Sequence, residues 1–482
     1  MVPILLIHGY ASEGSHNPVE EIYGDLPAHL RQEFGDDAVV EIDLSRWISL
    51  SDGISLDDVS FAMQRALNEK FSHLLASGFH VVIHSTGALV VRNWIRRFSP
   101  KPSPVKNLVY LAGANFGSGL AHIGQGQLSR WGRLILSGTG RGTKVLKELE
   151  FGSWKTLDLH HAFLEDGFDM RLNYEVQEFC LNGSQTLPAM RMVPIRYIKE
   201  DSSDNTVRTS ACNLNFNYIP VSPHTEGANI SKESIAELME QRLNNIEVAH
   251  SYYEYNLSRM CENREPVPFA VIFETAHFGA DIGIVAGKDN RGEVIPLVSE
   301  ALNTPYDVDV YRQVAKSFAA ASASTFARAA ELHGSPIEWN KQAQYEGHAQ
   351  LIFRLRDQFG DAVEHFDITI RSGEKQKETT RLEDCIEDEH NNSRDKGAIT
   401  FYLRTQRYND GTWTELLDSV QKTNVEITGY EALSDEISYL PLTISLEPEQ
   451  IRHAIQSFRT TIFDIELMRL PSDKVFAITK TP

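Results

Sequence analysis

The sequence contains little of what would assign it to several large classes of protein. Only four of its 482 residues are cysteines, and they form neither a CxxC pair nor a metal-ligand spacing. Free thiols are therefore expected in place of disulfides or a zinc site. No stretch reaches the roughly 18 consecutive apolar residues that would span a bilayer.

Basic residues are scarce relative to acidic ones, 46 against 66, and the formal net charge is −20. This balance argues against nucleic acid as a partner and against electrostatic docking onto an anionic membrane, because both need an excess of lysine and arginine. Neutral and zwitterionic lipids remain open as substrates, with transient contact to a lipid surface. The N-terminal run MVPILLIHGY is short and lacks a basic region, so it predicts a buried strand and not a signal peptide. A cytoplasmic location is the resulting expectation.

The chain is too long for one ordinary domain, and its first part alternates short apolar runs with amphipathic helical stretches. This alternation predicts a doubly wound, mostly parallel sheet covered by helices on both faces, in a domain of residues 1–335. The expected strands lie at 3–7, 39–44, 79–84, 106–112, 193–198 and 268–274.

One segment, about 117–191, breaks this alternation. It is largely helical in pattern and is interrupted by GTGRG at 138–142. An insertion of this size after a strand is often a cap over an active site. Its apolar residues either line an acyl pocket or only pack helices together, and the sequence leaves both open. They are Trp131, Leu134, Ile135, Leu136, Trp154, Leu157 and Phe163.

The hydropathy pattern changes after HGSP (333–336). Phe366, Ile368 and Ile370 alternate with polar residues, and later runs repeat this period of two. The period is typical of antiparallel strands with one buried face. Residues 336–482 are therefore expected to form a separate antiparallel β-rich domain, a sandwich or a barrel. Its ligand or protein partner is not predicted.

The strongest chemical signal is IHSTGALVVRNWI (83–95). An apolar strand runs directly into Ser85, and an apolar helix follows at once. A serine on such a sharp turn presents its hydroxyl at the carboxyl edge of the sheet, as a nucleophile must. Gly87 suits the tight turn, whereas Ile83 stands where the usual motif has a small residue. A helix N-cap serine is the alternative.

A second signal, ILLIHGY (4–10), is a buried strand that ends in His-Gly. It can place the next backbone amide beside the nucleophile. The amides of Tyr10 and Thr86 are then the expected oxyanion hole.

These segments, HGY and HSTG, together with LVYLAGANFGS (108–118), resemble the lipase and esterase branch of the α/β-hydrolase superfamily, over roughly residues 1–330. The resemblance implies an acid after a later strand and a histidine after the last one. MVPIRYIKEDSSDNTVRTSA (192–211) matches the acid loop and selects Asp204, with Asp201 in reserve. PFAVIFETAHFGADIGI (268–284) matches the histidine loop and selects His277. The chain order serine, aspartate, histidine is typical of the superfamily.

The resemblance implies a serine hydrolase of carboxylic esters that forms an acyl-enzyme and needs no metal or other cofactor. The apolar cap favours lipid-like esters, as in lipases and phospholipases. Amide or thioester hydrolysis and acyl transfer by the same triad stay open. So does a partner-regulated effector or scaffold whose C-terminal domain binds another protein.

Overall fold

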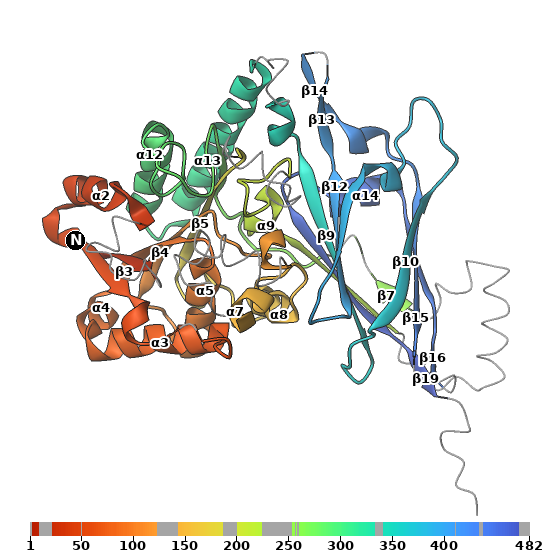
Figure 1. Ribbon diagram of the computed structural model, residues 1–482, viewed down its shortest axis with the longest axis horizontal. Coiled ribbons are helices and arrows are strands. Elements are labelled where there is room, and N and C mark those ends of the chain that lie inside the picture. Colours follow the sequence, from red (N-terminus) through yellow and green to blue (C-terminus); the bar gives the residue numbers. More distant parts are fainter. Residues whose placement is uncertain are drawn as a thin grey trace, which may run out of the picture. The chain divides into compact units, whose positions relative to one another are not determined.

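The computed structural model describes residues 2–8, 22–49, 51–122, 143–186, 200–223, 253–255, 257, 260–332, 341–409, 411–432 and 437–471 (Figure 1). The chain divides into two compact units. Unit 1 comprises Met1–Asn215, Asn263–His348 and Tyr408–Trp413. Unit 2 comprises Phe216–Glu262, Ala349–Arg407 and Thr414–Pro482.

Unit 1 is built on a six-stranded sheet in the order β2-β1-β3-β4-β5-β8, and all its pairs are parallel. The strands are β1 (Ile4–His8), β2 (Val39–Asp43), β3 (Phe79–His84), β4 (Val105–Leu111), β5 (Gln177–Gly183) and β8 (Phe269–Ile272). The strand order reverses between β1 and β3. In doubly wound sheets, the carboxyl ends of the strands at such a switch point form the binding crevice.

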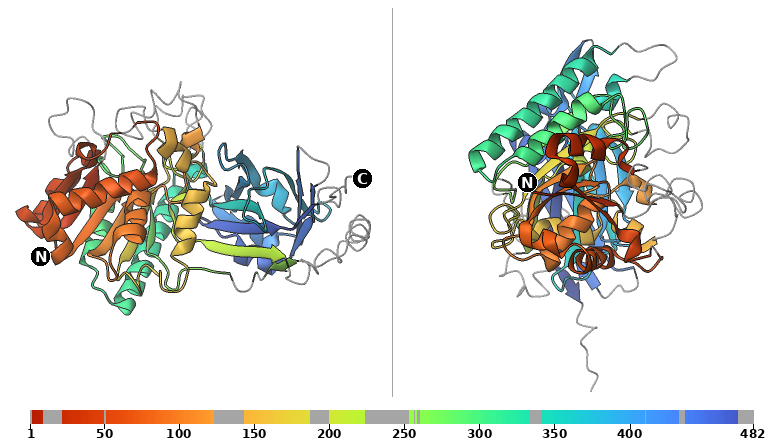
Figure 2. Two further views of the ribbon diagram at one scale, coloured as in Figure 1. Left: turned by 90° about the horizontal axis from the view of Figure 1, so that it is seen from below. Right: turned by 90° about the vertical axis from the view of Figure 1, so that its left-hand side faces the viewer.

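Helices cover both faces of this sheet, as predicted. Figure 1 shows α2, α12 and α13 on one face and α3, α4 and α5 on the other, and Figure 2 shows the green helices α12 and α13 side by side. Their bounds are α2 (Leu26–Phe34), α3 (Leu56–Glu69), α4 (Ser72–Ser77), α5 (Gly87–Phe98), α12 (Arg291–Asn303) and α13 (Val308–Ala330). Fully buried apolar side chains of the sheet and of α2, α12 and α13 form one continuous core.

The predicted cap at about 117–191 needs a correction. It does contain the helices α7 (Thr143–Glu148) and α8 (Trp154–Ala162), but its later part is β5, which lies between β4 and β8. The polar residues of β5 conceal the strand in the sequence. Gln177 donates to the Asn107 side chain at 3.1 Å, and Glu178 accepts from Tyr110 at 2.5 Å. The strand predicted at 193–198 lies outside the described residues.

Unit 2 contains two further sheets. A six-stranded sheet has the order β11-β12-β9-β18-β6-β7, and a five-stranded sheet has the order β10-β15-β16-β19, with β17 also paired to β15. The described residues of unit 2 also include the helix α14 (Pro448–Ala454). The strands are β6 (Asn217–Pro223), β7 (Tyr253–Tyr255), β9 (His348–Asp357), β10 (His365–Ser372), β11 (Ile386–Asn391), β12 (Ala398–Arg404), β15 (Thr423–Tyr430), β16 (Ile437–Tyr439), β17 (Leu442–Leu446), β18 (Thr460–Leu467) and β19 (Arg469–Pro471). β13 (Gln406–Asn409) and β14 (Thr412–Glu415) form a separate two-stranded sheet, and Tyr408–Trp413 belong to unit 1.

The antiparallel β-rich prediction for the C-terminal part is confirmed by the five-stranded sheet, whose strands pair antiparallel. In the other sheet, however, β18 is parallel to both β9 and β6. Because β6 comes from residues 217–223, the grouping differs from the predicted division at 335/336. Buried Arg354 and Asp464 form an ion pair at 2.7 Å within this sheet.

Within the described residues, no helix combines the length and the apolar character needed to cross a membrane.

His80, a half-buried histidine of β3, predicts a pH-dependent stability. Burial, followed by the charge of Lys106, lowers the pKa of His80 from 6.5 to about 4. On acidification, His80 therefore takes up a proton at a higher pH in the unfolded chain than in the folded protein. Its contribution to the free energy of unfolding is fully present above pH 6.5 and is lost as the pH falls toward 4. We expect His80→Gln to flatten this dependence by up to about 1.4 kcal/mol per pH unit in urea unfolding. His73→Gln, at an exposed histidine, provides the control. Equal slopes of the free energy of unfolding against pH for the wild type and His80→Gln would contradict the assignment.

Candidate active site

Ser85 lies on a strained turn between a strand and a helix. β3 ends at His84 and α5 begins at Gly87. The φ angle of Ser85 is 54°, in the left-handed region that residues with a side chain rarely adopt. Its amide donates to the carbonyl oxygen of Leu111 at 3.1 Å, and its own carbonyl oxygen accepts from the Ala88 amide at 3.1 Å. The turn is therefore fixed from both sides, at the carboxyl edge of the sheet.

The unusual Ile83 is accommodated by Gly87. A Cβ atom on Gly87 would overlap the Cγ1 and Cδ1 atoms of Ile83. The isoleucine side chain thus fills the space that a side chain at 87 would need. This packing favours glycine at 87 as long as isoleucine stands at 83.

We expect Gly87→Ala to lower the free energy of unfolding by about 1–3 kcal/mol, because the new methyl group forces Ile83 or the turn to move. Ile83→Ala by itself should also lower the free energy of unfolding, but it removes the atoms that a methyl group at 87 would overlap. The double variant should therefore be more stable than the sum of the two single effects predicts. Denaturant unfolding of the four proteins measures this coupling. Gly53→Ala is the matched control, since no atom lies within 4 Å of a Cβ at that position. Simple additivity would contradict the packing argument.

The structure brings the side chains of Ser85, His277 and Asp204 together. Nε2 of His277 lies 3.0 Å from Oγ of Ser85, and Nδ1 lies 2.8 Å from Oδ2 of Asp204. All three side chains are buried, with exposures of 4%, 0% and 0% for serine, histidine and aspartate. A proton on Nδ1, donated to the carboxylate, leaves Nε2 free to accept the serine proton. Three segments far apart in the sequence thus form one hydrogen-bonded chain.

The acid loop holds Asp204 by its backbone. Oδ1 of Asp204 accepts the amides of Thr206 at 3.0 Å and Val207 at 2.7 Å, so only Oδ2 is directed to the histidine. The His277 amide donates to the Asp204 carbonyl oxygen at 2.9 Å, which ties the two loops together. The carboxylate hydrogen-bonded to His277 is therefore that of Asp204, and the reserve residue Asp201 does not occupy this place.

One of the two predicted oxyanion donors lies within the described residues. Thr86 follows Ser85 directly and precedes the first turn of α5. In the described part of the chain, its amide donates no backbone hydrogen bond. It is therefore available to an oxygen atom beside Ser85. Tyr10 lies outside the described residues.

Similar proteins of known structure identify the fold of this chain. No family model matches the sequence, and no curated protein matches it significantly. Among solved structures, phospholipase PlaB from Legionella pneumophila is similar with a TM-score of 0.78 at 22% identity, covering 100% of this chain and 97% of PlaB. PlaB in complex with thio-NAD gives a TM-score of 0.77 at 21% identity, with the same coverage. The chain has an α/β-hydrolase fold.

His84 is a further residue of this candidate site, and sequence reasoning missed it. Its Nε2 lies 3.2 Å from the carbonyl oxygen of His277, and the two rings are 4.5 Å apart. Burial, followed by the neighbouring His277, holds the pKa of His84 well below its usual value. Because a carbonyl oxygen only accepts, Nε2 of His84 donates this hydrogen bond. His84 thus supports the loop that carries His277. The signal in the sequence was a histidine directly before the serine.

A small cavity of about 10 Å³ adjoins Ser85 and Thr86 in unit 1. Its apolar wall is formed by Ala114, Ala121, Leu146, Leu149 and Val207. Two leucines of the insertion, Leu146 and Leu149, therefore line the site. Leu157 and Phe163 are buried elsewhere, and residues 131–136 lie outside the described residues.

The described ranges were compared with the side chains that a metal site needs. They contain no group of three or more histidine, cysteine, aspartate or glutamate side chains that could hold a metal ion. The four cysteines are free thiols.

Proposed function

We propose that this protein is a serine hydrolase that cleaves carboxylic esters of lipid-like substrates through an acyl-enzyme at Ser85. The observation that carries the proposal is the hydrogen-bonded chain from Ser85 through His277 to Asp204. It joins a serine on a strand–helix turn to a buried imidazole and a buried carboxylate. Such a chain activates a hydroxyl that is a weak nucleophile by itself.

Each residue has a role in this mechanism. Oγ of Ser85 attacks the ester carbonyl while Nε2 of His277 takes its proton. Asp204 holds the imidazole in the required tautomer and stabilises its protonated form. The amides of Thr86 and Tyr10 stabilise the oxyanion, a contribution of about 10²–10³-fold for each donor. His277 then gives the proton to the departing alcohol, and a water molecule activated in the same way releases the acid.

The apolar wall beside Ser85 supports an apolar acyl group. Leu146, Leu149 and Val207 offer no hydrogen-bonding side chain to a polar substituent. The cavity of about 10 Å³ holds only the first part of an acyl group, and these side chains favour an apolar group there over a polar one. The name of the similar protein PlaB, a phospholipase, agrees with this choice.

A fluorophosphonate probe tests the nucleophile. We expect covalent labelling that maps to the peptide carrying Ser85. Ser118 lines the same cavity, so Ser118→Ala is the matched control and should still be labelled. Labelling at another serine would contradict the assignment.

A series of p-nitrophenyl esters from acetate to palmitate, run beside phospholipids, tests the substrate class. We expect kcat/KM to rise with chain length. A preference for acetate, with no turnover beyond hexanoate, would contradict the lipid-like substrate and leave the nucleophile assignment intact. If matched amides or thioesters are cleaved faster than the esters, the amide or thioester is the preferred substrate.

A further inference from the structure

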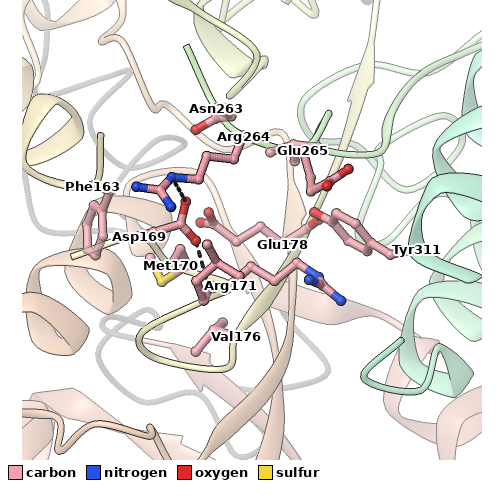
Figure 3. Close-up of a pocket in the computed structure, with 12 residues that line it drawn as sticks. Phe163, Asp169, Met170, Arg171, Val176, Glu178, Asn263, Arg264, Glu265 and Tyr311 are labelled. Carbon is pink, nitrogen blue, oxygen red and sulfur yellow. Dashed lines mark hydrogen bonds and ion pairs between the residues drawn. The ribbon is translucent and has the colours of Figure 1, made fainter. Parts of the chain in front are cut away.

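Figure 3 shows a second cavity in unit 1, with a volume of about 170 Å³. It lies at the opposite edge of the sheet from Ser85. Val176 and Glu178 line it at the beginning of β5, whereas Ser85 follows the end of β3. Because the strands are parallel, their beginnings and ends lie at opposite edges. The remaining lining comes from the loop before β5, from residues 263–267 before β8, and from Tyr311 of α13. This cavity is therefore separate from the proposed catalytic site.

The carboxylates of this cavity all have partners. Glu178 is paired with buried Arg92 and accepts from Tyr110 at 2.5 Å. Glu265 accepts two hydrogen bonds from Arg312, each 2.7 Å long. The third carboxylate is that of Asp169.

Asp169 accepts the Leu172 amide at 2.7 Å and lies 3.9 Å from Nε of Arg264, an ion pair drawn in Figure 3. Arg264 is also paired with Asp166 at 2.7 Å. The negative charges that face the cavity are thus already compensated within the protein.

Arg171 is the exception. Its Nε is buried and has no hydrogen-bond partner, and none of the described carboxylates forms an ion pair with its guanidinium. The group lies over the rings of Tyr306 at 4.8 Å and Tyr311 at 5.7 Å, which hold it in place. The carboxylate of Asp307, which does not line the cavity, interacts with its charge without a direct ion pair. A fixed guanidinium with a free N–H matches the geometry of a carboxylate or phosphate. An unsatisfied buried donor is costly, so an acceptor at this place would be favoured.

The rest of the wall is apolar. Met170, Val176 and Val267 line the cavity and are buried, with exposures of 6%, 1% and 7%. We propose that this cavity binds a small organic anion, a carboxylate or a phosphate monoester. Its charged oxygens contact Arg171, and its apolar group packs against Met170, Val176 and Val267. The site does not depend on the proposed esterase activity.

Calorimetric titration of the full chain with benzoate and phenyl phosphate tests this proposal, with benzamide as the neutral analogue. We expect both anions to bind saturably and benzamide to bind at least about tenfold more weakly, because hydrogen bonds to a charged group are the strong ones. Arg171→Gln should weaken anion binding by about tenfold or more. Arg328→Gln makes the same charge change at an exposed arginine paired with Glu293, outside the cavity, and should leave binding unchanged.

A second pair of variants keeps the test decisive if Arg171→Gln fails to fold. Leu172 lines the cavity but is 50% exposed, so its replacement carries little risk for folding. Leu172→Glu places a competing carboxylate at the mouth and should weaken anion binding, whereas Leu172→Gln should not. Absence of saturable binding to the wild type, equal binding of benzamide, or equal losses in Arg171→Gln and Arg328→Gln would each overturn the proposal.

Discussion

Replacing Ser85 with alanine is expected to lower kcat for ester hydrolysis by about 10⁶-fold, because the nucleophile and the proton that His277 removes are both lost. Residual turnover should come from substrate binding and the oxyanion donors alone. Steady-state assays with a p-nitrophenyl ester of intermediate chain length measure the effect. Labelling by a fluorophosphonate should disappear in the same variant.

The alanine variant should remain folded. Serine and alanine both carry a Cβ atom, so the strain of a φ angle of 54° is the same in the two proteins. The lost contact is the hydrogen bond of Oγ to His277, and we expect the free energy of unfolding to change by no more than about 1.5 kcal/mol. A folded Ser85→Ala variant that keeps a hundredth of the wild-type kcat would exclude Ser85 as the nucleophile.

The turn at Ser85 could be predicted because its determinants are local. An apolar run, one serine and an apolar helix follow each other without a gap, and the backbone has few ways to connect them. Asp204 and His277 could be selected only through the resemblance to α/β-hydrolases. Nothing in the sequence itself states that residues 85, 204 and 277 meet, since this depends on the order of the strands in the sheet.

Features that depend on distant partners were missed. β5 carries Gln177 and Glu178, and these polar residues become acceptable in a buried strand only when Asn107 and Tyr110 of β4 pair with them. β6 was assigned to the first domain because its parallel partner β18 lies more than two hundred residues later. The overlap that Gly87 avoids also requires knowing where the side chain of Ile83 points. Local hydropathy contains none of this information.

Asp204→Asn is expected to lower kcat by about 10⁴-fold while leaving the geometry intact. The reason lies in how the loop holds the carboxyl group. Oδ1 accepts the amides of Thr206 and Val207, so the oxygen of an asparagine would take that position and its NH₂ group would face Nδ1 of His277. An NH₂ group donates, which forces the histidine proton onto Nε2. Nε2 can then no longer accept the proton of Ser85.

Asp201→Asn makes the same chemical change three residues earlier in the same loop and is the matched control. Because the hydrogen bond to His277 comes from Asp204, the control should keep kcat within about tenfold of the wild type, whereas loss of the tautomer costs about 10⁴-fold. Steady-state kinetics of the two variants on one ester separate the cases. Equal losses would mean that charge in the loop, and not the orientation of the imidazole, sets the rate. A near-normal kcat in Asp204→Asn would show that His277 takes its working tautomer without this carboxylate.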